Sequence, residues 1–183
     1  MRFKFNPRKT AQAAAHIARR HGGAINYMKL IKLLYLADRQ MLLDHGTVIT
    51  GDRHVAMKHG PVLSQVLNLI NEGDRDNERS PWFDLFRAAE NYEVSLKPEA
   101  PTETDELSRY ELKLLETVDE KYGSMDKWKL VELLHTILPE WSDPGETSTP
   151  ISPEMILRAE SRSDEEVRQV KAAADDAWFI DSL

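Results

Sequence analysis

The sequence contains no cysteine among its 183 residues. Without thiols the chain cannot form disulfides, hold zinc or an iron–sulfur cluster on thiolates, or use a cysteine nucleophile. Long apolar runs are missing too: none approaches the roughly 18 residues that a membrane-spanning helix needs. The first residues also lack the apolar stretch of a secretion signal. We therefore expect a cytoplasmic protein.

Glycine is scarce, at eight residues. There is no Walker loop, no Gly-x-Gly-x-x-Gly fingerprint and no Gly-x-Ser-x-Gly nucleophile elbow. The histidine pairs His16/His21 and His54/His59 are each five residues apart, a spacing that suits a shared metal poorly on either a helix or a strand. We expect neither a cofactor nor a metal.

Three aspartates offer the best case for an enzyme. Asp38, Asp44 and Asp52 could combine with His59 into an acid/base site, which would make the chain a small hydrolase or metal enzyme using its histidine-rich N-terminal half. The same residues serve equally well as helix caps, turn residues and surface ion-pair partners. We favour these structural roles and expect no catalytic residue.

Charge is distributed unevenly along a chain of otherwise ordinary globular composition. Residues 1–60 hold 11 Lys and Arg against 3 Asp and Glu, residues 61–139 hold 9 against 17, and residues 140–183 hold 4 against 11. We expect the basic and acidic parts to pack together and neutralise each other. The alternative is a basic surface for an acidic protein or a nucleic acid, although a pI of 5.4 makes nucleic acid an improbable partner.

Helical periodicity dominates the chain. Asn6 before Pro7 reads as a helix cap followed by a first helical residue, and Lys29, Lys32 and Arg39 of the second helix can stay in solvent. Ser163 and Glu166 stand at capping-box spacing. The predicted helices cover residues 7–21, 26–44, 61–70, 105–122 and 124–137, with a short one from about 151 and a last one from 163.

Short β-rich segments interrupt the helices. Residues 47–50 and 53–58 flank Gly51-Asp52, a sequence suited to a type II′ hairpin turn. Because a lone two-stranded ribbon is marginal in water, residues 92–97 are the best candidate for a third strand. The fold class is therefore mainly α (α+β): a compact bundle of about seven helices with a small antiparallel hairpin or three-stranded sheet.

An aromatic segment follows a polar loop at residues 73–80. Aromatic rings and arginines are enriched where proteins grip one another, so this region is our candidate partner-binding surface, although the rings could instead cover an end of the sheet. Its residues are Trp82, Phe83, Phe86, Arg75 and Arg79.

An ordered set of motifs resembles the Panacea domain of SocA-like antitoxins. The set comprises Lys29-Leu-Ile-Lys-Leu-Leu-Tyr-Leu-Ala-Asp38, Ile49-Thr-Gly-Asp52, His59-Gly-Pro-Val62, His135 followed by Pro139-Glu-Trp141, and Ile151-Ser-Pro. The resemblance spans about residues 8–180. It implies one domain over residues 1–183, with a core at about 8–142 and a C-terminal helical extension at about 151–183.

The same resemblance implies a bacterial or phage antitoxin that neutralises a toxin encoded by the neighbouring gene through direct binding. An alternative is a proteolytic adaptor that delivers the bound toxin to an AAA+ protease, suggested by the C-terminal residues 178–183. The resemblance brings no catalytic residues, and its motif positions are expected to specify the fold. These positions are Tyr35, Asp38, Gly51, Asp52, His59, Gly60, Pro61, His135 and Trp141.

Overall fold

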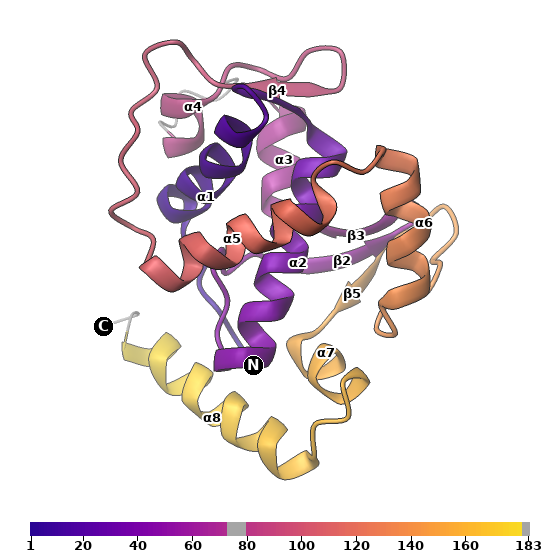
Figure 1. Ribbon diagram of the computed structural model, residues 1–183. Helices are drawn as coiled ribbons and strands as arrows, with labels where there is room; N and C mark the ends of the chain where they lie inside the picture. The colour runs from indigo at the N-terminus through magenta and orange to yellow at the C-terminus, as the bar shows by residue number, and fades with distance from the viewer. Residues whose placement is uncertain (73–79, 181–183) are drawn as a thin grey trace.

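The computed structural model describes residues 1–72 and 80–180. Within them the chain forms eight helices and two small antiparallel sheets (Figure 1), which confirms the mainly α expectation. The helices are α1 (Pro7–Arg20), α2 (Tyr27–His45), α3 (Ser64–Glu72), α4 (Pro81–Leu85), α5 (Arg109–Tyr122), α6 (Lys127–Ile137), α7 (Pro153–Ala159) and α8 (Asp164–Ile180). The strands are β1 (Ala24–Asn26), β2 (His54–Met57), β3 (Gly60–Leu63), β4 (Glu93–Ser95) and β5 (Thr149–Ile151).

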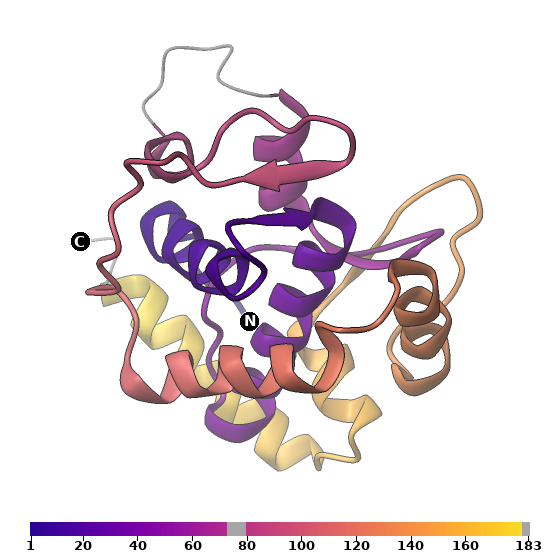
Figure 2. The same cartoon turned by 45° about the horizontal axis from the view of Figure 1, so that its top comes forward.

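Helix α2 is the centre of the molecule. It begins at Asn26, whose side chain accepts a bond from the Lys29 amide, and ends at Gly46 in the left-handed conformation. Helices α1 and α5 pack against it and against each other (Figure 2). Because α2 is covered on several sides, Lys32 and Arg39 are buried, contrary to the expectation that both stay in solvent.

The hairpin exists but lies one strand further along the chain than expected. Strand β2 pairs with β3, and residues 47–50 form no strand. Pro61 was expected to open a helix. It lies instead in strand β3, where it pairs with Ala56 of β2. The three-stranded sheet has the order β3-β2-β5, so β3 is an edge strand, where a residue without an amide proton is tolerated.

The third strand of this sheet is β5, not the predicted segment 92–97. That segment contributes β4, which pairs with β1 in a separate two-stranded sheet. Two helix starts also shift by a few residues: Ser108, not Asp105, caps α5 through a capping box with Glu111, and Asp126, not Ser124, caps α6. In each case a neighbouring cap residue satisfies the first amides instead.

The C-terminal helices attach to the rest of the molecule through a second hydrophobic cluster. Leu42 of α2 and Ala56 of β2 meet Ile151, Ile156 and Val167 there. Figure 1 shows α8 at the opposite end of the molecule from α4 and β4. The extension therefore packs on α2 and on the three-stranded sheet.

Part of the uneven charge is paired within the molecule. Ion pairs join the basic N-terminal part to acidic residues far along the chain, and they are Arg8–Asp105, Lys9–Glu111, Arg20–Asp119, Arg39–Glu140, Arg39–Glu160 and Lys58–Glu146. None of the helices in the described residues is long and apolar enough to cross a membrane.

Candidate functional site

Asp38 anchors the loop that follows α2. Its carboxylate is fully buried and accepts the amides of Ile49 (2.8 Å) and Thr50 (3.0 Å) as well as the Thr50 hydroxyl. His54 Nε2 lies 3.4 Å from the same carboxylate. Asp38 is thus occupied by hydrogen bonds that hold the loop.

Asp52 caps a helix that begins twelve residues later. Its carboxylate accepts the amides of Gln65 (2.9 Å) and Val66 (3.0 Å) at the start of α3. Burial raises the pKa of this carboxyl group although the amides oppose the shift. Gly51 beside it has φ of 69°, and a β-carbon there would clash with the Lys4 carbonyl. Both residues are used to fold the loop rather than to form a turn of a hairpin.

Glu140 joins α2 to the segment after α6. It accepts the Tyr35 hydroxyl (2.7 Å) and both Arg39 Nε (2.8 Å) and Nη2 (3.1 Å), and Arg39 also pairs with Glu160 at the end of α7. Burial by itself would raise the pKa of Glu140, but the hydrogen bonds from Arg39 and Tyr35 hold this pKa below its usual value. Sequence reasoning did not single out Glu140, which lies inside the Pro139-Glu140-Trp141 motif.

The hypothetical acid/base site is not assembled. Asp38 and Asp52 lie near each other in the interior, but Asp44 bonds to Tyr110 and Gln40 on the surface. His59 instead contacts the edge of the Trp128 ring. Among residues 1–72 and 80–180, no group of three or more His, Asp or Glu side chains is arranged to hold a metal ion.

The aromatic segment lies largely in the core. Trp82 and Phe86 are 1% and 0% exposed and stack on each other, with ring centres 4.4 Å apart. Their burial contradicts the expectation that these two rings are presented to a partner, because the one-turn helix α4 packs them against α1. Phe83 is partly buried against the same core. Arg75 and Arg79 fall outside the described residues.

His135 and Trp141 fasten α6 to the hairpin. Their rings stack face to face at 3.8 Å, and the indole N–H donates to the Met57 carbonyl of β2 (3.1 Å). Burial, with the nearby Lys32 charge, lowers the pKa of His135. Its Nε2 is buried and has no hydrogen-bond partner in the described part of the chain.

Gly60 lies against two buried nitrogen atoms. A β-carbon built on it would be 3.3 Å from Lys32 Nζ and 3.7 Å from His135 Nε2, and its φ of 94° suits glycine. Lys32 is 1% exposed, and its ammonium donates to the Pro61 carbonyl (3.0 Å). Burial alone lowers the pKa of Lys32 to about 7. The sequence signal for this site was a lysine inside the apolar run of residues 30–34.

A cavity of about 230 Å³ opens beside Gly60. We call it the turn pocket. Its walls come from α2, the β2–β3 hairpin and the start of α3, and they are mostly apolar. Its lining residues are Tyr27, Met28, Ile31, Lys32, Met57, Lys58, His59, Gly60, Val62 and Leu67.

Exposed aromatic rings extend from the walls of the turn pocket. Tyr92, 68% exposed, lies 6.1 Å from Tyr27, and Trp128, 48% exposed, lies 5.3 Å from His59. Lys127 Nζ connects them, 5.6 Å from the centre of the Tyr92 ring and 5.5 Å from that of Trp128. Asn91 and Tyr92 both have positive φ, a conformation that asparagine tolerates but that is uncommon for a bulky residue such as tyrosine. We call Tyr92, Lys127 and Trp128 the aromatic rim.

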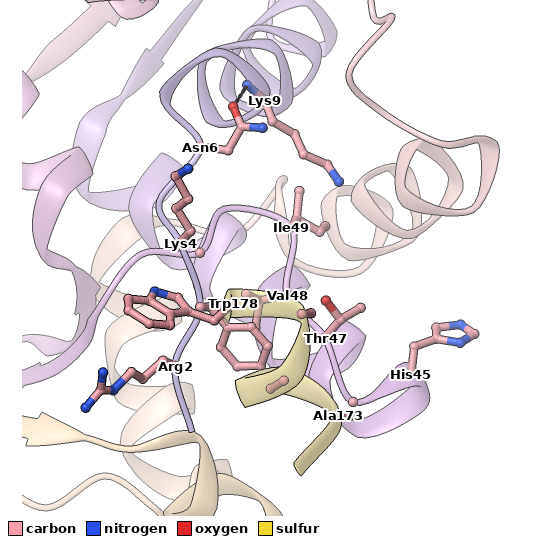
Figure 3. Close-up of a pocket in the computed structure, with 15 residues that line it drawn as sticks. Arg2, Lys4, Asn6, Lys9, His45, Thr47, Val48, Ile49, Ala173 and Trp178 are labelled. Carbon is pink, nitrogen blue, oxygen red and sulfur yellow. Dashed lines mark hydrogen bonds between the residues drawn. The ribbon is translucent and has the colours of Figure 1, made fainter. Parts of the chain in front are cut away.

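A second cavity, of about 330 Å³, lies between the N-terminal segment, residues 45–51 and α8 (Figure 3). Its basic side chains are already engaged: the Arg2 guanidinium lies over the Trp178 ring, and Lys9 pairs with Glu111. This surface therefore offers less unmatched charge than the turn pocket.

The lowered pKa of Lys32 predicts a pH-dependent stability. Between about pH 7 and pH 10 the unfolded chain holds a proton that the folded protein releases, so the free energy of unfolding rises with pH by up to about 1.4 kcal/mol per unit. Below that window the buried charge carries its full cost, and Lys32→Met should stabilise the protein by about 1–2 kcal/mol. Urea unfolding at pH 6 to 9 measures both effects.

The matched control is Lys29→Met, one turn earlier on α2, where the ammonium bonds to the Gly123 carbonyl. This variant should keep the pH slope of the unaltered protein between pH 7 and pH 9. If the free energy of unfolding rises equally with pH in Lys32→Met and in the unaltered protein, the pH dependence does not come from Lys32.

Comparison with known proteins gives one match. A family model described as antitoxin SocA-like, Panacea domain, covers residues 30–142. This interval is more than half of the chain and contains Lys32, Asp38, Gly60, His135 and Trp141. No curated protein and no solved structure matches the chain.

Proposed function

Because the chain belongs to the SocA-like antitoxin family with a Panacea domain, we propose that it neutralises a protein toxin by binding the toxin directly. The family match carries this proposal. The occupied carboxylates support it, since Asp38 and Asp52 are used in folding rather than held ready for chemistry. Residues 1–183 then act as one antitoxin domain in the cytoplasm of a bacterium, or of a cell infected by a phage.

We place the toxin-binding surface at the aromatic rim and turn pocket. Tyr and Trp side chains dominate the energetics of protein interfaces, above all where they surround a pocket that the partner can fill. Tyr92 and Trp128 are large, exposed and adjacent to a concave apolar site. A stable complex would bury about 1,600 Å² in total or more.

Co-expression with the neighbouring gene tests the proposal. We expect that gene alone to arrest growth, growth to recover with this chain, and the two proteins to co-purify. A neighbouring gene that is harmless alone, or that still kills beside this chain, would rule the proposal out.

Replacing Trp128 tests the surface. Trp128→Ala should weaken toxin binding at least about 30-fold, the loss of about 2 kcal/mol typical of a central aromatic residue. Ile137→Ala is the control: Ile137 is exposed on the same helix but lies nine residues on, about half a turn around its axis. Binding is measured by calorimetry, and equal affinities for the two variants would place the interface elsewhere.

A proteolytic adaptor is the alternative mechanism. Phe179 and Ile180 at the end of α8 are 61% and 68% exposed, as a docking element for a protease would be. In that case the toxin half-life falls when this chain is present, and rescue is lost in cells without the AAA+ protease. Rescue that persists there, with an unchanged toxin half-life, supports masking instead.

A further inference from the structure

Two basic side chains of helix α2, Lys32 and Arg39, are buried, and they differ in their ion-pair partners. Arg39 is held by two carboxylates, Glu140 and Glu160. Lys32, two turns earlier and more deeply buried, donates to one backbone carbonyl, and no carboxylate pairs with it in the described part of the chain. An ammonium has three protons to donate, and a buried charge without a counter-charge is expensive. The fold therefore buries an amine that has no carboxylate partner in the described residues.

A second nitrogen stands beside it. His135 Nε2 is buried without a hydrogen-bond partner in the described residues. Like Lys32 Nζ, it lies within 4 Å of a β-carbon built on Gly60, although His135 adjoins the turn pocket through Gly60 and is not one of its lining residues. Buried polar atoms are nearly always bonded, so one acceptor between these two nitrogen atoms would give His135 Nε2 its missing partner and Lys32 Nζ a second one. Because Gly60 has no side chain, nothing from that residue fills the space next to them.

The surroundings favour an anion. The turn pocket that Lys32 lines also contains Lys58 and His59, and no Asp or Glu is among its described lining residues. Lys58 pairs with Glu146, but this pair is exposed to solvent. A volume of about 230 Å³ suits a protein side chain better than a large ligand. A mostly apolar pocket that includes the amine of Lys32 fits an acidic side chain, because the methylene groups can contact the apolar walls while the carboxylate meets the amine.

We propose that the turn pocket receives an acidic side chain of the toxin, whose carboxylate binds Lys32 Nζ and His135 Nε2 over Gly60. This inference rests on the proposed function. It assigns Lys32, which is buried without a carboxylate partner in the described residues, to recognition: its ammonium group is paired with a carboxylate in the complex. The neighbouring aromatic rim would exclude water from that ion pair, which strengthens it.

Binding should then take up a proton. The carboxylate restores the ammonium form of Lys32, so affinity should fall as pH rises above 7, by up to tenfold per unit. The other titratable groups near Lys32 are Tyr27 on α2, Lys58 and His59 on the hairpin, and His135 on α6, with Asp143 beyond His135. Burial lowers the pKa of His135, so its imidazole loses its charge below this pH range.

The experiment uses purified full-length chain and an inactive variant of the toxin encoded beside it. Calorimetry at pH 6.5, 7.5 and 8.5 compares the unaltered chain with Lys32→Met, His135→Phe and Lys29→Met. We expect Lys32→Met to bind at least 30-fold more weakly at pH 6.5 and to lose the pH dependence, while its melting temperature stays equal or rises. His135→Phe keeps a ring on Trp141 and should bind about tenfold more weakly, and Lys29→Met should bind within twofold.

The outcomes separate the two proposals. If the unaltered chain does not bind the toxin, the proposed function and this inference both fail. If it binds, and folded Lys32→Met binds within twofold of it, only the inference fails. On the toxin, one Asp→Asn or Glu→Gln change should reproduce the loss and add nothing to Lys32→Met; strictly additive losses for every acidic residue would overturn the assigned contact.

Discussion

Glu140→Ala should lower the free energy of unfolding by about 3–5 kcal/mol. The carboxylate satisfies the Tyr35 hydroxyl and two donors of Arg39 in the interior. Its removal leaves a buried guanidinium with only the outer Glu160 and a buried hydroxyl without an acceptor. Urea unfolding monitored by circular dichroism measures the loss.

Two further variants make this result specific. Glu146→Ala removes an exposed carboxylate that pairs with Lys58 and should change stability by less than about 0.5 kcal/mol. The double change Arg39→Met with Glu140→Leu should recover much of the loss, because it removes the unpaired charge together with its partner. A double variant no more stable than Glu140→Ala would show that the cost is not electrostatic.

Asp38→Ala should cost about 3–5 kcal/mol as well, for a different reason. Asp38 holds the loop between α2 and β2 through the amides of Ile49 and Thr50. Without the carboxylate these amides are buried and unbonded, and their protection against hydrogen exchange should disappear. Asp44→Ala is the control, because Asp44 accepts its bonds at the surface. Protected amides at positions 49 and 50 in Asp38→Ala would contradict this role.

The parts of the fold that the sequence predicted are those controlled by local interactions. Asn6 with Pro7, and Ser163 with Glu166, start helices through bonds to residues three positions away, so their patterns identify them directly. The position of α2 followed from its apolar periodicity in the same way.

The misplaced elements depend on partners far along the chain. Asp52 has the sequence of a turn residue, but it caps α3. Strand β5 joins the sheet from nearly one hundred residues beyond β2. Neither the capping of α3 by Asp52 nor the pairing of β5 with β2 can be recognised from the residues next to each segment.

The candidate site was only partly visible in the sequence. His59, Gly60, Pro61, His135 and Trp141 were singled out as motif positions, and the structure brings them around one hairpin. Lys32 was predicted to be in solvent because lysine usually is; its burial comes from packing against β3 and α6. Trp128 was not singled out in the sequence. It is half-exposed, because α6 buries only Leu130, Val131 and Leu134.

The ion pairs between the basic first third and the acidic remainder limit how early the fold can be completed during synthesis. Arg39 meets Glu160 across 121 positions of sequence, so this contact cannot form until most of the chain has left the ribosome. Contacts of such long range also form slowly. A newly made chain would therefore complete this part of its fold only when translation is nearly finished, and its last two helices would dock after the central helix has already formed.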